Sequence, residues 1–275
     1  MEILKISVIV TTYNWPEALN RVLAVLAYQD YPDFEVIVAD DGSTDDTKIL
    51  IEQHQRQQHY SLHHVWQPDD GFRAAAIRNR AIEQASGDYI LFLDGDCIPR
   101  PHFLSRHAQL AEQGWFVTGN RILLSETATI ETLTGQLPVQ LYQPHQWLWM
   151  RLTGRVNRLL PLLKLPGKKW RYRNHNKWKK AITCNLAAWK NDLLDINGFN
   201  EEFQGWGLED SDLVIRLINS DIQRKEGRFS TTVIHLWHIE AERKDLEKNQ
   251  SKLQYSINNK TTLTTNGIQQ NQGIS

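Results

Sequence analysis

The sequence has very few cysteines and no long hydrophobic run. Only two cysteines occur among its 275 residues, Cys97 and Cys184, and they lie far apart. Such a pair excludes a disulfide framework and the spacing of a structural zinc site, and it fits a reducing compartment. The apolar run near the N-terminus is about six residues long, too short for a signal peptide or a membrane span. We therefore expect a globular, cytoplasmic protein.

Acidic residues are missing from the middle of the chain. Between Thr132 and Asn191 there is no Asp or Glu, but there are twelve Lys or Arg and five of the ten tryptophans. The total net charge is only −1, and we expect no nucleic-acid partner. Residues 135–180 form a basic, aromatic insertion with three open interpretations. In the first, residues 151–180 contact an anionic membrane at its inner face. In the second, the insertion closes as a lid over an anionic acceptor. In the third, it is solvated and partly disordered.

Two glycine-rich phosphate-binding motifs are also absent. No G-x-G-x-x-G follows the first predicted strand, and no G-x-x-x-x-G-K-[ST] occurs. This excludes the dinucleotide fingerprint and a phosphate site built from backbone amides. A sugar nucleotidyltransferase would carry a glycine-rich loop with Arg and Lys after the first strand, and "TTYNWPEAL" has neither.

Strand and helix patterns alternate in the first half of the chain. Short runs rich in β-branched and apolar residues predict buried strands at 6–10, 34–40, 62–66 and 89–93. Helices are predicted between them: over 19–26, from a capping hydroxyl in 43–47, and over 73–87 with Gly87 closing the last. This alternation predicts an α/β fold with a mostly parallel, twisted sheet and helices on both faces.

Three of the predicted strands end in polar residues. Thr11 to Asn14, Asp40 to Ser43 and Asp94-Gly95-Asp96 follow them directly. Ligands of such sheets bind beyond the carboxyl ends of the strands. Hard divalent cations take carboxylate ligands and bridge to phosphates, and Gly95 leaves room for a ligand near the backbone. A hairpin turn is the alternative interpretation of Asp-Gly. We expect a site for Mn²⁺ or Mg²⁺.

Four segments together resemble a family 2 glycosyltransferase of the GT-A fold. They are "SVIVTTYN", "VIVADDGSTDDT", "AIRNRAI..ASGDYILFLDGDCIP" and "LAAWKNDLLDINGFNEEFQGWGLEDSDL". The last is similar to the subgroup with a G-W-G-x-E-D motif, which includes β-1,4-galactosyltransferases and chondroitin-polymerase-like enzymes. The resemblance covers about Ile6 to His238 except the basic insertion. It implies one domain over 1–240, with a nucleotide-sugar half (1–99) and an acceptor half (100–240). For 241–275 we expect a polar helix and a disordered tail.

The resemblance also implies roles for residues of the first half. Thr11 and Tyr13 match positions that contact the base and ribose. Asp41, and less directly Asp40, match an aspartate that accepts a hydrogen bond from the base. Arg73 matches a basic residue that faces the nucleotide, with Arg78 as the alternative.

The expected metal ligands come from both halves. Asp94 matches an aspartate near the ribose and the metal, and Asp96 matches the direct metal ligand. The third ligand is a histidine on a late strand, with His235 as first choice and His238 as second. The two histidines would lie on opposite faces of a continuous strand, because they differ by three positions.

The stretch "GWGLEDSDL" is the candidate catalytic motif. Gly205 and Gly207 flank Trp206, whose indole can stack on the apolar face of a sugar. Acidic residues in the first turn of a helix are also favoured by the helix dipole, which is the structural alternative. The resemblance implies that Asp210 is the general base, that Glu209 binds acceptor hydroxyls and that Asn185 lies near the donor sugar or the acceptor.

These residues predict an inverting glycosyltransferase. It would move a sugar from a nucleotide diphosphate donor, a UDP-sugar in first place, to a hydroxyl of a glycan or lipid-linked acceptor. Synthesis of a bacterial surface polysaccharide or lipopolysaccharide is the expected setting. A non-catalytic nucleotide-sugar-binding module and a sugar nucleotidyltransferase are the alternatives.

Overall fold

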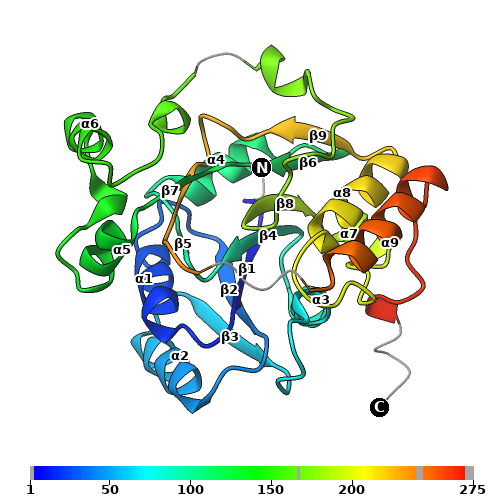
Figure 1. Ribbon diagram of the computed structural model, residues 1–275, viewed down its shortest axis with the longest axis horizontal. Coiled ribbons are helices and arrows are strands. Elements are labelled where there is room, and N and C mark those ends of the chain that lie inside the picture. Colours follow the sequence, from blue (N-terminus) through cyan, green and yellow to red (C-terminus); the bar gives the residue numbers. More distant parts are fainter. Residues whose placement is uncertain (1–2, 166–167, 240–243, 270–275) are drawn as a thin grey trace.

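A seven-stranded sheet forms the centre of the protein (Figure 1). The computed structural model describes residues 3–165, 168–239 and 244–269. The strand order is β3-β2-β1-β4-β8-β6-β9, and four of its six neighbouring pairs are parallel. The strands are β1 (Ile6–Thr12), β2 (Phe34–Asp40), β3 (Ser61–Trp66), β4 (Tyr89–Asp94), β6 (Trp115–Thr118), β8 (Asn185–Trp189) and β9 (Gln223–Glu226). The predicted mostly parallel sheet is confirmed.

A second sheet of three short strands is built from segments that are far apart in the sequence. Its order is β5-β10-β7, with β5 (Cys97–Ile98), β7 (Arg121–Leu123) and β10 (Val233–His235). Since β5 directly follows β4, this sheet brings β10 to the carboxyl end of the central sheet.

Helices cover both faces of the central sheet, as predicted. They are α1 (Pro16–Leu26), α2 (Asp45–Gln57), α3 (Ala74–Gln84), α4 (Phe103–Leu110), α5 (Glu126–Leu133), α6 (Pro144–Leu152), α7 (Lys190–Asp195), α8 (Glu209–Asn219) and α9 (Leu246–Asn258). Short 3₁₀ turns lie at Val139–Leu141, Leu160–Leu162 and Lys169–Tyr172.

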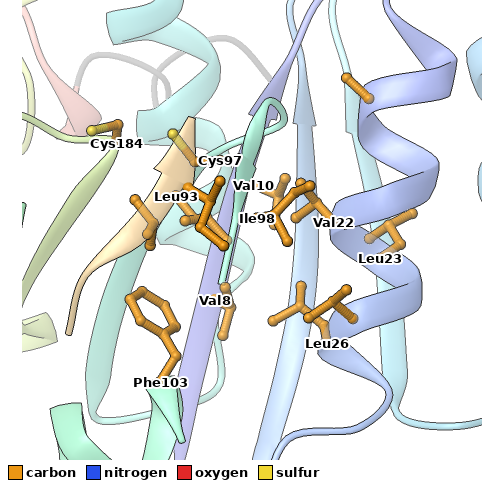
Figure 2. Packing of buried hydrophobic residues seen from close by; sticks show 14 of the residues in the cluster. Val8, Val10, Val22, Leu23, Leu26, Leu93, Cys97, Ile98, Phe103 and Cys184 are labelled. Carbon is orange, nitrogen blue, oxygen red and sulfur yellow. The ribbon is translucent and has the colours of Figure 1, made fainter. Parts of the chain in front are cut away.

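The alternation of side chains along each strand divides the core in two. Val8 and Val10 of β1 point to the α1 face and share a cluster with Val22 and Leu26 (Figure 2). Ile9 belongs to the cluster on the opposite face. That opposite layer is filled by α3 and α8. Because both faces are covered, the central strands are apolar at successive positions, which is the pattern that their sequence shows.

The structure corrects one predicted helix cap and one predicted helix end. Helix α2 begins at Asp45 after Thr44, within the predicted range 43–47, but no side chain caps it. Ser43 instead accepts a hydrogen bond from the Asn14 amide, so its hydroxyl ties two strand-end loops together. Helix α3 ends at Gln84 and not at Gly87. A Cβ at Gly87 would lie 2.7 Å from Ser7 Oγ, so this glycine permits close packing of the turn against β1.

The C-terminal region is more ordered than predicted. The expected polar helix is α9, but residues 259–269 continue along the protein and are not a free tail. Ile268 is buried in the core layer that contains α3 and α8. Asn197 donates to the Thr264 carbonyl and accepts from the Gln269 amide. The predicted disorder beyond 269 concerns residues 270–275, which lie outside the described residues.

The basic insertion is folded where the structure describes it. Helix α6 begins at Pro144, which suits the first helical position, and it buries Trp147 and Met150 in the main core. Val156 forms a β-bridge with Leu124 next to β7. The interpretation as a partly disordered insertion is therefore wrong for residues 135–165. The division at residue 99 into a nucleotide half and an acceptor half stays a prediction.

Candidate active site

Polar residues from three strands meet at one edge of the central sheet. In register, Thr11 of β1 is opposite Asp94 of β4, and Thr12 is opposite Asp40 of β2. The Gly95 amide donates to the Thr11 carbonyl at 2.8 Å, and a Cβ at Gly95 would lie 3.1 Å from that oxygen. A glycine at this point therefore allows the chain to turn closely over β1 and to present Asp94 and Asp96 on either side.

Asp96 and two histidines form a cluster that could hold a metal ion. Asp96 Oδ2 lies 3.4 Å from His235 Nε2 and 3.2 Å from His238 Nε2, and the three ligand atoms lie within 4.8 Å of one another. Asp96 Oδ1 is buried and has no hydrogen-bond partner among the described residues. A buried carboxylate oxygen without a partner is costly, and a bound cation would remove that cost.

Both histidines approach Asp96 because the strand is shorter than predicted. Strand β10 ends at His235, and the Leu236 amide then donates to the Asp96 carbonyl. The chain leaves the strand geometry after that point, so the expected placement of His235 and His238 on opposite faces was wrong. His238 Nδ1 lies 2.8 Å from the Ile239 carbonyl, so Nδ1 donates a hydrogen bond there and Nε2 is turned toward Asp96.

The three groups perturb one another's protonation. Burial opposes ionisation of Asp96, but the hydrogen bond from His238 and the charge of His235 outweigh it and hold the Asp96 pKa below its ordinary value. The hydrogen bond to Asp96 raises the pKa of His238 to about 9. Burial lowers the pKa of His235, although Asp96 opposes this shift. The cluster thus holds an ionised carboxylate between two histidines whose pKa values are shifted in opposite directions.

Arg78 is the central cation of the site, and Arg73 is not. The buried Arg78 guanidinium donates to Thr11 Oγ1 and to Glu209 Oε1, both at 3.0 Å, and it lies 3.4 Å from Asp94 Oδ1. It therefore joins β1, β4 and α8. The side chain of Arg73 turns away to the Pro68 carbonyl, and only its backbone amide reaches the site.

The fold separates the two candidate arginines. By sequence either could face the nucleotide, but only Arg78 of α3 is buried between the sheet and α8. Burial lowers the pKa of an arginine, but the carboxylates of Glu209 and Asp94 outweigh it and raise the Arg78 pKa. Arg78 therefore stays charged.

The loop before α8 has an unusual backbone. Gly205, Gly207 and Leu208 all have positive φ angles, of 72°, 101° and 78°. Glycine adopts this region freely, but a leucine there is strained. Asn249 of α9 donates to the Gly207 carbonyl and holds the loop in place. The loop also contains the partly buried Trp206. It leads into the first turn of α8, which carries Glu209 and Asp210.

The two acids of this turn differ in their surroundings. Glu209 is ion-paired with Arg78, so one of its oxygens is not free for an acceptor hydroxyl. Burial and the nearby charge of Glu209 raise the pKa of Asp210 to about 7, against the attraction of Arg78. Asp210 can therefore gain and lose a proton near neutral pH.

The remaining predicted nucleotide residues surround the end of β2. Asp41 is buried and accepts hydrogen bonds from Gln67 Nε2 and from the Arg73 amide; burial raises its pKa. Asp40 is used structurally, since it accepts from the Ser43 amide and lies 3.0 Å from His64. Tyr13 is half exposed at the rim, and its hydroxyl donates to Asp69.

Asn185 does not reach an accessible part of the site. Its side chain is fully buried at the start of β8. Its amide nitrogen donates to the Asn120 and Thr231 carbonyls, and its oxygen lies 3.0 Å from His107 Nε2. The sequence prediction of a contact with sugar is corrected here: these partners use the side chain to join β8 to two loops.

The two cysteines, far apart in sequence, come together beside Asp94. The sulfur atoms of Cys97 and Cys184 and a carboxylate oxygen of Asp94 lie within 4.8 Å of one another (Figure 2 shows the two thiols). Both cysteines are buried and free. Burial raises the pKa of the Cys97 thiol well above its ordinary value, so this group stays protonated beside the carboxylates. Their spacing in the sequence gave no indication that the two thiols lie close together.

Comparison with known families decides the assignment of the chain. The sequence matches the family model described as glycosyl transferase family 2 over residues 7–161, which is more than half of the chain. The chain belongs to glycosyl transferase family 2. A further match, over residues 165–241, is to the family described as the N-terminal domain of galactosyltransferase. The resemblance stated from the sequence motifs is confirmed.

Curated relatives of this family 2 chain are longer than it is. Validoxylamine A glucosyltransferase of Streptomyces hygroscopicus subsp. jinggangensis (strain 5008) is 29% identical over 86% of the chain and 55% of the relative. Hyaluronan synthase of Pasteurella multocida is 30% identical over 88% of the chain and 25% of the relative. Chondroitin synthase of Escherichia coli is 26% identical over 77% of the chain and 32% of the relative. The chain spans about half the length, or less, of these relatives.

Solved structures establish the fold. S. aureus TarS 1–349 in complex with UDP superposes with a TM-score of 0.64 at 18% identity, covering 93% of this chain and 66% of that one. Mannosyltransferase PcManGT from Pyrobaculum calidifontis in complex with GDP-Man and Mn²⁺ superposes with a TM-score of 0.59 at 18% identity, covering 86% of this chain and 57% of that one. The predicted GT-A fold is confirmed. None of the helices within residues 3–165, 168–239 and 244–269 is long and apolar enough to cross a bilayer.

Proposed function

We propose that this family 2 protein transfers a sugar from a nucleoside diphosphate donor to a hydroxyl group of a glycan or lipid-linked acceptor, with inversion at the anomeric carbon. One observation carries the proposal: Arg78 joins the Asp94 end of β4 to the first turn of α8. A metal-ligating cluster and a carboxylate with a raised pKa thereby lie on the two sides of one cation. This suits a reaction in which a diphosphate leaves and a hydroxyl loses its proton.

The donor nucleotide would bind at the ends of β1 and β2. Asp41 has accepted one hydrogen bond on each oxygen, and a carboxylate oxygen can accept a second one, from a base N–H. Tyr13 and Thr11 lie at the adjacent strand end for contact with the base and ribose. We favour a UDP-sugar, because UDP and UDP-GlcNAc are bound in TarS structures of the same fold, and GDP-Man, bound in PcManGT, is the competitor.

A divalent ion would be held by Asp96, His235 and His238, with Asp94 on the ribose side. Mg²⁺ prefers oxygen ligands, whereas imidazole suits transition ions, so two histidines favour Mn²⁺ over Mg²⁺. The ion in PcManGT is Mn²⁺. When bound, such an ion would offset the negative charge of the diphosphate leaving group.

Asp210 would act as the general base. The acceptor hydroxyl gives its proton to the Asp210 carboxylate while its oxygen forms a bond to the anomeric carbon, and the bond from that carbon to the diphosphate breaks on the opposite face. An α-linked donor thus gives a β-linked product. A pKa near 7 suits this role, since a base works best when its pKa is close to the working pH.

Glu209 and Trp206 would position the acceptor around this base. Glu209 is held by Arg78, which fixes the first turn of α8 relative to Asp94. The indole of Trp206 offers a platform for the apolar face of a sugar.

The named relatives that make hyaluronan and chondroitin support a role in polysaccharide assembly, and we extend this to surface polysaccharide or lipopolysaccharide of bacteria.

The metal and donor assignment is tested by thermal shift with UDP, GDP and dTDP, each with and without Mn²⁺. A ligand at about a hundred times its Kd stabilises the native state by about 2.7 kcal/mol. We expect a Mn²⁺-dependent rise in melting temperature with UDP, lost in Asp96→Asn. Asp88→Asn is the matched control, because Asp88 is exposed at the opposite end of β4. A shift that survives in Asp96→Asn would contradict the assignment.

The base assignment is tested by Asp210→Asn. The amide cannot accept the hydroxyl proton, so we expect kcat to fall by about 10²- to 10⁴-fold while UDP binding stays intact. The product of the wild type, examined by NMR for the anomeric coupling constant, should have the inverted configuration. Donor binding without any transfer, in all acceptors tried, would favour a binding module over an enzyme.

A further inference from the structure

Helix α6 and the following 3₁₀ turn expose apolar side chains that a folded protein normally covers. On α6, Leu152 is 78% exposed, Leu148 52% and Trp149 49%. These three positions share the helix face opposite Trp147 and Met150, which are buried. Leu141, Leu160 and Leu163 add exposed side chains on either side of the helix. We call these six residues, Leu141, Leu148, Trp149, Leu152, Leu160 and Leu163, the leucine surface.

The leucine surface is held rigidly. Arg155 forms two hydrogen bonds with the Glu131 carboxylate and stacks over the Trp149 ring with its guanidinium carbon 4.7 Å from the centroid. Its amide also donates to the Met150 carbonyl. With Trp147 and Met150 anchored in the core, α6 cannot rotate to bury its leucines. Their exposure is a property of the folded chain and calls for a contact outside it.

Positive charge accompanies the exposed leucines. Arg151, Arg158 and Lys164 are exposed within the same segment, and no Asp or Glu occurs between Thr132 and Asn191. Leucine and tryptophan beside arginine and lysine, without acids, is the composition of helices that lie in the interface of an anionic bilayer. A twofold contact with a second copy would place these cations against themselves.

The surface is also tied to the metal-ligating cluster. The Asn157 amide donates to the Leu123 carbonyl of β7, and the next residue, Leu124, donates to the His235 carbonyl. Exposed Trp237 is bound through its amide to Thr129 of α5. The segment that carries the leucines is thus one strand away from His235. A membrane against the leucine surface would lie on the side of the molecule that carries the candidate metal ligand His235.

We infer that the leucine surface docks on an anionic lipid bilayer and brings the active site to a lipid-linked acceptor. The bilayer accepts the leucines and Trp149 among its acyl chains, while the three cations lie at the level of the anionic headgroups. The naming of the acceptor rests on the proposed function; the docking itself does not.

The experiment is flotation of the whole chain with phosphatidylcholine vesicles, with and without phosphatidylglycerol. We expect binding only to the anionic vesicles, weakened by salt. Leu148→Ser/Leu152→Ser should reduce the partition coefficient by tenfold or more, since it removes two exposed leucines. Arg151→Gln/Lys164→Gln should reduce it by about fivefold per charge at low salt.

The matched control is Tyr255→Ser/Lys260→Gln. It removes an exposed apolar and an exposed basic side chain on or next to α9, which lies across the molecule from α6 (Figure 1). The control should bind vesicles like the wild type. Because all six substituted side chains are exposed, unchanged circular dichroism and melting temperature are expected for every variant.

Three outcomes would overturn the inference. They are no binding of the wild type to anionic vesicles, equal loss in the control, and a dimer seen by light scattering that dissociates in Leu148→Ser/Leu152→Ser without any lipid binding. UDP binding is measured on the same samples. If vesicle binding fails and UDP binding is intact, only the docking falls; if UDP binding fails and vesicle binding holds, only the proposed function and the lipid-linked acceptor fall.

Discussion

At the scale of single residues, this protein uses burial to set different pKa values for neighbouring carboxyl groups. Burial raises the pKa of Asp94 to about 6, while Arg78 opposes this and Asp96 adds to it. Asp96 nevertheless stays ionised because two histidines face it. Asp210 is pushed to about 7 by burial and by Glu209. Groups of the same chemical type can thus serve as ligand and as base.

The pKa of Asp210 predicts the acid side of the pH profile. Activity needs the carboxylate form, so kcat/KM should fall as the pH drops below about 7. Glu209→Gln removes a negative charge and leaves Arg78 less neutralised; both changes lower the Asp210 pKa. The acid limb should therefore move to lower pH in Glu209→Gln and stay in place in Glu247→Gln, an exposed control on α9. An unmoved limb would show that another group controls it.

His107 predicts a pH dependence of stability. It is fully buried, and burial lowers its pKa to about 4, against the hydrogen bond with Asn185. Between pH 6.5 and 4 the unfolded chain binds a proton on this residue and the folded one does not, so stability is lost as the pH falls. From pH 7 to 5 the loss is about 2 kcal/mol.

The variant His107→Gln isolates this effect. Glutamine keeps a donor for Asn185 but does not titrate. In urea unfolding at pH 7 and pH 5, the wild type should lose about 2 kcal/mol more than the variant. Equal losses in the two proteins would mean that His107 is protonated in the fold.

At the scale of elements, a buried ion pair within α8 is joined to α9 by a hydrogen bond. Asp212 accepts from Arg216 Nε at 2.8 Å and from Ser256 Oγ of α9 at 2.6 Å, and Arg216 also donates to the Ile196 carbonyl. Asp212 is therefore the acid of "EDSD" with a structural role, while Asp210 faces the site. Since α9 also holds the Gly207 loop through Asn249, this pair supports the geometry of the catalytic motif.

The prediction for this element is a large loss on breaking the pair. Asp212→Asn leaves the Arg216 charge buried without a counterion, which should lower the free energy of unfolding by about 3–5 kcal/mol. Ser256→Ala removes one hydrogen bond and should cost about 1–3 kcal/mol. Asp212→Leu/Arg216→Met removes both charges and should recover most of the loss. Chemical denaturation measures all three; an Asp212→Asn protein as stable as wild type would refute the role of the pair.

At the scale of the whole molecule, the C-terminal segment closes one side of the core. Ile268, which follows α9 in the chain, is 2% exposed and packs in the core layer of α3 and α8. Deleting residues 259–275 should therefore lower the free energy of unfolding by at least the burial of one isoleucine, about 1.5–3 kcal/mol. Deleting only 270–275 is the control, because it leaves Ile268 in place, and it should have the higher melting temperature of the two truncations. Equal melting temperatures for both truncations would restore the predicted disordered tail, which began at Thr261.

Much of this protein could be predicted from local sequence. The buried runs before Thr11, Asp41 and Asp94 indicate strands, because strands covered on both faces are apolar at every position. Parallel strands place their carboxyl ends at one edge, which is why the strand-end residues could be expected together. The two glycines around Trp206 likewise indicated a backbone that other residues rarely adopt.

Tertiary structure alone decided the partners that are distant in sequence. The sequence offered two candidates each for the cation and the histidine, and only packing placed Arg78 at the centre and let both His235 and His238 reach Asp96. The same packing buried Asn185, paired the two cysteines beside Asp94 and left the leucines of α6 outside. Local patterns report the period and burial of one element, whereas these contacts depend on how elements far apart in the chain are set against one another.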